Sequence, residues 1–176
     1  MKDFSLLLVR GLTGTLMAGH GAQKLFGYGG GPGVEGTAGM MESLGLKPGK
    51  PWAVLAGASE FGGGALTALG FLNPLGPLGI IGAMNIATHR VHGTDPIWAT
   101  EGGPELPVTN SAITAAVALS GPGRYSLDQM FGIKLPRWIV VLALALGALA
   151  SYSALTAEPD ASGGEEETAE SSGEGA

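Results

Sequence analysis

Residues Phe4–Phe26, FSLLLVRGLTGTLMAGHGAQKLF, form the first long apolar stretch of this 176-residue chain. A membrane hydrocarbon core about 30 Å thick is crossed by about 20 mostly apolar helical residues, so the stretch is long enough to span it. It also contains Arg10, His20 and Lys24. Lys24 lies near the end of the stretch, where a long side chain can reach the interface. Arg10 is either a similar anchor or an intramembrane charge facing a buried ionic partner, and we favour the partner.

The composition indicates a membrane protein. Apolar residues make up 45% of the chain, and charged residues make up only 14%, against about 25% in soluble domains. Glycine, which lets membrane helices approach closely, accounts for 32 residues. Seven of the 15 acidic residues lie among the last twenty residues. The remaining eight acids and nine bases leave a nearly neutral body, and we expect lipid contact and no nucleic-acid partner.

The chain contains no cysteine. This excludes disulfides, thiolate redox chemistry and cysteine-ligated metal sites, and we expect no metal site. A redox role would therefore require a bound cofactor or a partner protein.

Four further stretches are predicted to form membrane helices, separated by turn-forming Gly and Pro residues. They are Pro51–Leu72, Leu75–His92, Val108–Ser120 and Leu135–Leu155. A short amphipathic patch within residues 34–50 is expected to lie in the interface. The predicted fold is an all-α membrane protein. It has a four-helix transmembrane bundle over residues 1–130, an additional transmembrane helix over 131–156 and a disordered acidic tail over 157–176.

Five crossings place the two termini on opposite sides of the membrane. Basic residues do not show which side is cytoplasmic, because each side receives four of them. Those on the side of the N-terminus are Lys2, Arg124, Lys134 and Arg137, and those on the other side are Lys24, Lys47, Lys50 and Arg90.

Polar residues of the first three stretches are expected to gather inside the bundle. At about 1.5 Å per residue, Glu60 and Asn85 lie at nearly the same depth, with Arg10 and His20 about 7–8 Å to either side. An arginine can bridge that distance, so we predict a buried Arg10–Glu60 pair. The full candidate cluster, a ligand or proton site, is Arg10, His20, Lys24, Glu60, Asn85 and His89.

This cluster has several possible roles, and the sequence identifies no catalytic residue. Arg, His and Asn supply donors for the carbonyls of a quinone headgroup, and His and Glu can carry protons. Two histidines, His20 and His89, also match the minimum for a b-type haem. Paired histidines are a weak signal, so we favour quinone over haem. The competing structural interpretation is that the cluster only holds the helices in register.

Three separate patches resemble the DoxX family of integral membrane proteins. Arg10-Gly11 followed by His20–Gly27 is similar to the opening of that family. Glu60 with Gly63-Gly64 and Leu69-Gly70 is similar to its second helix, and Gly121–Asp128 to the segment that closes its four-helix core. The resemblance covers residues 6–128, and the fifth stretch and the tail depart from it.

The resemblance implies a prokaryotic, multi-pass protein of the inner or plasma membrane that is associated with oxidoreductases. We expect a membrane subunit in redox or thiol-stress metabolism, with quinone-linked electron transfer to or from partner oxidoreductases. The alternative is a non-enzymatic membrane scaffold or small-molecule permease that uses the same cavity.

Overall fold

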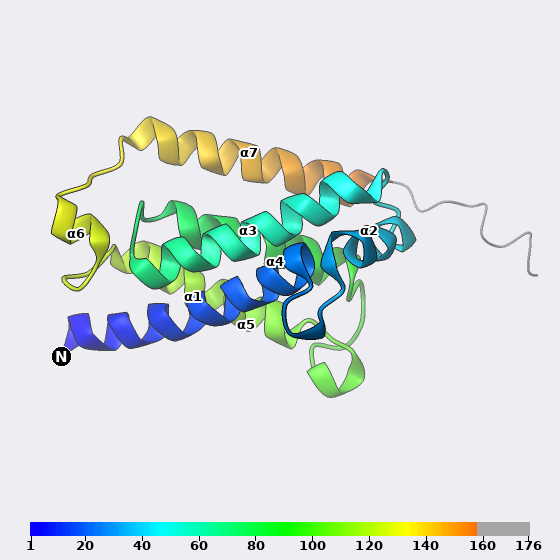
Figure 1. Ribbon diagram of the computed structural model, residues 1–176, viewed down its shortest axis with the longest axis horizontal. Helices are drawn as coiled ribbons and strands as arrows, with labels where there is room; N and C mark the ends of the chain where they lie inside the picture. Colours follow the sequence, from blue (N-terminus) through cyan, green and yellow to red (C-terminus); the bar gives the residue numbers. More distant parts are fainter. Residues whose placement is uncertain (158–176) are drawn as a thin grey trace, which may run out of the picture.

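The computed structural model describes residues 1–157, and that part of the chain is helical without strands (Figure 1). The predicted acidic tail lies outside the described residues, apart from Ala157. The α-helices are α1 (Lys2–Phe26), α2 (Gly33–Ser43), α3 (Gly49–Leu69), α4 (Leu75–Arg90), α5 (Glu105–Ser120), α6 (Leu127–Phe131) and α7 (Arg137–Thr156). Two single 3-10 turns, η1 (Tyr28–Gly30) and η2 (Ala99–Glu101), lie in the connections.

The helix ends follow the breakers in the sequence. Helices α1 and α3 end at Gly27 and Gly70, which adopt left-handed conformations with φ of 67° and 61°. A side chain would be strained at either position, so glycine allows the chain to turn away. The five long predicted stretches are confirmed as helices, with ends shifted by three residues or fewer.

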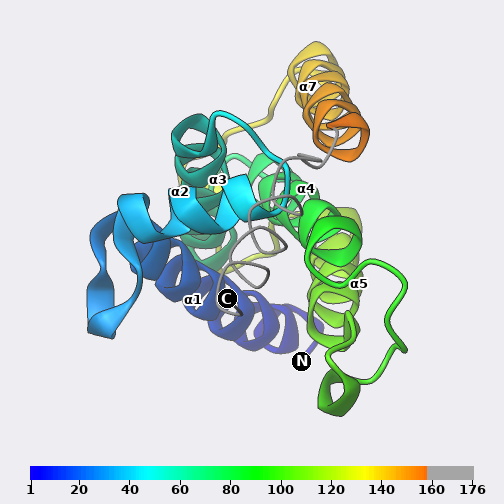
Figure 2. The ribbon, with the colours of Figure 1, turned by 90° about the vertical axis from the view of Figure 1, so that its right-hand side faces the viewer.

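Helices α1, α3, α4 and α5 form the central bundle, and the remaining elements lie around it. Helix α1 packs on α3, α3 on α4 and α4 on α5, while α1 also touches α5. Helix α7 packs on α4 from outside this bundle, and α2 lies across one end of α3 (Figure 2). The described part thus combines a four-helix bundle with one peripheral long helix.

The contact between α1 and α3 is a contact of backbones. A Cβ added to Gly14 would lie 2.4 Å from the Ala68 nitrogen, and one added to Gly64 would lie 2.3 Å from the Ala18 nitrogen. One added to Gly21 would lie 2.2 Å from the Phe61 nitrogen. Real Cβ atoms do not come this close to backbone, so these glycines let the two helices touch along their length.

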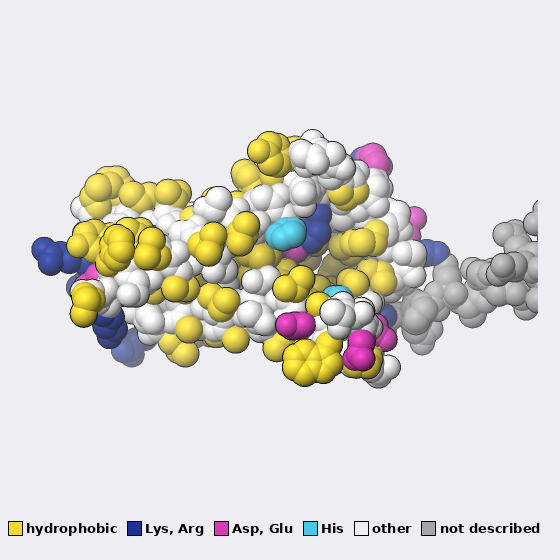
Figure 3. All heavy atoms as spheres, turned by 90° about the horizontal axis from the view of Figure 1, so that it is seen from below, with side chains coloured by type: hydrophobic (Ala, Val, Ile, Leu, Met, Phe, Trp, Pro, Cys, Tyr) yellow, Lys and Arg dark blue, Asp and Glu magenta, His cyan; other side chains and the backbone are white. Residues whose placement is uncertain are grey.

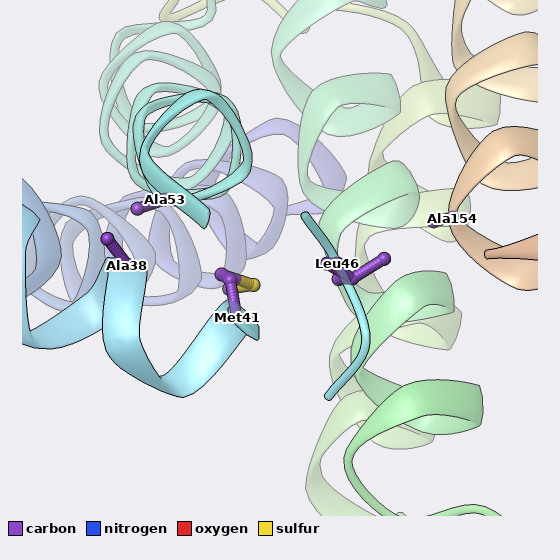
Figure 4. Close-up of a cluster of buried hydrophobic side chains, with 5 residues drawn as sticks. All are labelled: Ala38, Met41, Leu46, Ala53 and Ala154. Carbon is purple, nitrogen blue, oxygen red and sulfur yellow. The ribbon is translucent and has the colours of Figure 1, made fainter. Parts of the chain in front are cut away.

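Two small apolar clusters fill the interior. One consists of Met17, Ile80 and Met84 within the central bundle. The other joins α2, the start of α3 and the end of α7 (Figure 4). Its members are Ala38, Met41, Leu46, Ala53 and Ala154. Leu46, which is fully buried between the helices, thereby connects the α2–α3 loop to α7.

Of the described helices, only α7 is both long and apolar enough to cross a membrane by length and composition. Helices α4 and α5 have 16 residues each, about 24 Å of helix. Helices α1 and α3 are longer, but both carry charged residues and several glycines. The five membrane crossings therefore stay a prediction, although all five helices are present.

Because α1 and α3 touch along one face of α1, we expect alanine substitution of two nearby glycines of α1 to change the stability by different amounts. We expect Gly21→Ala to destabilise the protein by about 1–3 kcal/mol, because its Cβ would overlap the α3 backbone. Gly19→Ala is the matched control, since a Cβ there meets nothing within 4 Å, and it should be neutral or slightly stabilising. Thermal unfolding in detergent measures both, and equal losses would contradict the close contact.

Candidate functional site

An ion pair between Lys24 and Glu60 lies where α1 and α3 meet. Lys24 is in the last turn of α1, and its ammonium donates to Oε1 of Glu60 in the middle of α3. The Glu60 side chain is 3% exposed, whereas that of Lys24 is 26% exposed. The backbone contact of Gly21 with Phe61, next to Glu60, holds the two side chains at this level.

The second carboxylate oxygen of Glu60 is unusual. Oε2 is buried and has no hydrogen-bond partner within the described residues. A buried carboxylate normally uses its accepting capacity, because an unpaired buried polar atom destabilises the fold. Oε2 therefore marks a candidate site for a hydrogen-bond donor that comes from outside the chain.

Glu60 and Lys24 line a cavity of about 420 Å³ between α2, α3, α4 and α7. Most of the wall is apolar, formed by side chains such as Met41, Leu46 and Ile86. The polar groups that accompany the ion pair are Trp52, Ser59, Arg90 and Ser151. A mostly apolar cavity with a few polar groups is typical of a site for a small molecule.

Helix α7 closes one side of this cavity. It contributes Ala143, Gly147 and Ser151, one helical turn apart, together with Leu146 and Ala150. Its C-terminal end is held by Arg90 of α4, which donates from Nε to the Ala154 carbonyl at 2.6 Å and from Nη2 to the Ala157 carbonyl. Arg90 therefore joins the wall of the cavity to the helix that covers it.

Arg10 occupies a different place, and the predicted Arg10–Glu60 pair is wrong. The buried guanidinium donates to the carbonyls of Thr67 and Ala68 at the end of α3, at 3.4 and 2.6 Å, and to the Tyr125 carbonyl. Helix C-terminal carbonyls carry partial negative charge, so they stabilise a cation without a carboxylate partner. Glu60 pairs with Lys24 instead.

Asp128, in the connection between α5 and α7, holds the same region together. We call the contacts made by Arg10 and Asp128 the Arg10 junction. The two carboxylate oxygens of Asp128 accept from the backbone nitrogens of Leu72 and Asn73, each at 2.8 Å. Its own nitrogen donates to the Gly70 carbonyl at 3.1 Å, and its charge acts on Arg10. Arg10 and Asp128 therefore fasten α1, the α3–α4 turn and the start of α6 to one another.

The remaining members of the predicted cluster do not join it. His20 and His89 have exposed side chains on α1 and α4. Asn85 lines a second cavity of about 470 Å³ between α4, α5 and α7. Only Lys24 and Glu60 of the six predicted residues line the first cavity. Within residues 1–157, no group of three or more His, Asp or Glu side chains is placed to hold a metal ion.

Sequence reasoning missed Ser59, Arg90 and Ser151 as cavity residues. Ser59 adjoins Glu60 in the sequence, which is a usable signal. Ser151 continues the four-residue spacing of Ala143 and Gly147, a small-residue pattern that favours close helix contact. Arg90 lies at the end of an apolar stretch and resembles an ordinary interfacial anchor, so nothing in the sequence distinguished it.

The two charged centres should behave independently. We expect Arg10→Met to destabilise the protein by about 2–4 kcal/mol, because three carbonyls lose a charged donor. The loss should add to that of Glu60→Gln within about 0.5 kcal/mol, since the residues share no partner. Unfolding of both single variants and the double variant measures this. A strong departure from additivity would mean that the two centres are coupled.

Comparison with known proteins gives a family for this arrangement. The DoxX family model matches residues 5–93, just over half of the chain, from the first turns of α1 to just beyond α4. No curated protein and no solved structure matches the chain. The matched segment includes both residues of the ion pair, Lys24 and Glu60, and it includes Arg10, whereas Asp128 lies outside it. The chain belongs to the DoxX family, and it is accordingly a membrane protein.

Proposed function

We propose that this protein is a multi-pass membrane subunit of a redox system and binds the headgroup of a quinone in the cavity at Lys24 and Glu60. On this proposal α1, α3, α4, α5 and α7 cross the membrane. Electrons pass between the quinone and a partner oxidoreductase, because the chain has no cysteine for thiol redox chemistry. The observation that carries the proposal is the buried, unpartnered Oε2 of Glu60 in the wall of an apolar cavity.

The residues present fit a quinone headgroup. Its ring is apolar, as is most of the cavity wall, and its carbonyl oxygens need donors. Lys24 carries three N–H donors, of which the Glu60 contact uses one, and the Trp52 indole and the Ser59 hydroxyl are further donors in the wall. A cavity of about 420 Å³ also lies within the range of about 300–1,000 Å³ common for small-molecule sites.

The ion pair is also suited to supply and accept the protons that quinone reduction and quinol oxidation require. A bound quinone accepts two electrons and two protons to become a quinol, and the reverse reaction releases them. Oε2 of Glu60, the oxygen that has no other partner, would accept a hydrogen bond from a quinol hydroxyl, and in its protonated form it would donate to a quinone carbonyl, while Lys24 remains on Oε1. The partly exposed Lys24 connects the buried carboxylate with the surface. Glu60 is therefore the proposed proton carrier, and Lys24 the group that orients it.

Quinone content of the purified protein tests the proposal. Protein extracted in mild detergent should carry quinone detectable by mass spectrometry. Glu60→Gln and Lys24→Met should each lower its amount or affinity about tenfold, the effect of losing about 1.4 kcal/mol of charge-assisted hydrogen bonding.

The chain offers a matched control in a second ion pair. Lys50 and Glu35 are paired at 2.7 Å but are exposed and lie outside the cavity. Their variants Lys50→Met and Glu35→Gln should leave the quinone content unchanged. Capture of a partner protein with no quinone in any preparation would instead favour the scaffold, and transport of a small solute without quinone would favour the permease.

A further inference from the structure

The basic residues at the two ends of the bundle differ in their hydrogen bonding and ion pairing. At the end that contains the start of α1 and α7, Lys2, Arg124, Lys134 and Arg137 have exposed side chains. None of these four side chains forms a hydrogen bond or an ion pair within residues 1–157. We call these four residues the basic end.

The basic residues of the opposite end all have partners inside the chain. Lys24 pairs with Glu60, Lys50 with Glu35, and Arg90 donates to two carbonyls of the α7 end. Lys47 also interacts with another residue. The same end carries acidic residues on α2, in the α4–α5 connection and at the start of α5: Glu35, Glu42, Asp95, Glu101 and Glu105.

The four basic residues lie at the same end of the bundle and are alike in exposure. The Arg124 nitrogen donates to the Asp3 carboxylate at 3.2 Å, which joins the α5–α6 loop to the start of α1. Helix α6 and the start of α7 lie at the same end as the N-terminus (Figure 1). In Figure 3, a group of Lys and Arg side chains projects from one end of the molecule, most acidic side chains lie toward the other end among further Lys and Arg, and much of the surface between is hydrophobic or uncharged.

Large aromatic side chains accompany the basic end. Tyr125, Phe131 and Trp138 are 56%, 63% and 66% exposed and lie in the same segment of the chain as three of its four basic residues. Exposed aromatic rings beside free Lys and Arg are typical of a membrane–water interface, where rings lie at headgroup level and cations contact lipid phosphates.

We propose that the basic end contacts anionic phospholipid headgroups of the cytoplasmic leaflet and fixes the orientation of the protein. The N-terminus of α1 then lies on the cytoplasmic side, and the acidic end with α2 on the opposite side. Counting basic residues alone gives four against four, but only those at the basic end are free to attract anionic lipid. This inference is independent of quinone binding, and its test uses no quinone.

The absence of native cysteine makes the test direct. Single cysteines are placed at two exposed positions, Gln129→Cys at the basic end and Thr100→Cys at the acidic end. A membrane-impermeant maleimide applied to intact cells should label Thr100→Cys almost completely and Gln129→Cys only after the cells are opened. Labelling of Gln129→Cys in intact cells overturns the orientation.

A charge variant tests whether the basic end determines the orientation of the protein. Neutralising the four basic-end residues to Gln should lower labelling of Thr100→Cys in intact cells to about half, as the orientation becomes mixed. Lys47→Gln with Lys50→Gln at the acidic end is the control and should leave labelling complete. Complete labelling in the four-residue variant overturns the proposal.

Reconstituted vesicles test the lipid contact itself. Replacing part of the phosphatidylcholine with phosphatidylglycerol should raise the unfolding temperature of the wild-type protein and leave that of the four-residue variant unchanged. An equal rise in both proteins overturns a role for the basic end in lipid contact. The variant removes only exposed side chains without described partners, so its unfolding temperature in detergent should match that of the wild type.

Discussion

The backbone contact between α1 and α3 determines where the buried charges Arg10 and Glu60 lie. Gly14, Gly21 and Gly64 remove the side chains that would otherwise separate the two helices. Once the backbones touch, each residue of α1 has a fixed neighbour on α3. Lys24 is brought to Glu60 at one level, and Arg10 to the last carbonyls of α3 at another. The ion pair and the junction are therefore two results of one helix packing.

Arg10 and Glu60, the buried charges of α1 and α3, differ in their hydrogen-bond partners. Arg10 has three carbonyl acceptors and the charge of Asp128 nearby, so its hydrogen bonds go to the fold. Glu60 has one oxygen bound to Lys24 and another with no partner in the described chain. Hydrogen bonds within the fold stabilise one structure, whereas an open acceptor in a cavity is available to a ligand. For this reason we propose Glu60 for the functional site and a structural role for Arg10.

The sequence predicted the helices well because apolar length and Gly or Pro breakers act locally. It predicted the partner of Arg10 wrongly because it assumed the register of the two helices. Gly21 lies opposite Phe61, so Arg10, eleven residues earlier, lies about 16 Å along the axis from the level of Glu60. Helical side chains point toward the N-terminus of their helix, which turns Arg10 away from Glu60 and toward the end of antiparallel α3. Its acceptors are backbone carbonyls, which every residue has, so no sequence pattern marks them. His20 and Asn85 also face other surroundings, since His20 is exposed on α1 and Asn85 lines the second cavity.

The two ends of the bundle thus differ. The contacts of Arg10 and Asp128 lie at one end, which we call the fastened end, and the cavity at Glu60 lies toward the other, which we call the open end. At the fastened end, Arg10 and Asp128 bind three segments together through backbone groups, and the exposed residues of the basic end lie at the same end. Toward the open end, the cavity is covered by α2 and α7, which touch the central bundle on one side only. Movement of these covering helices would open the cavity without disturbing the Arg10 junction. A ligand would then enter at the covered end of the bundle, beside α2 or α7.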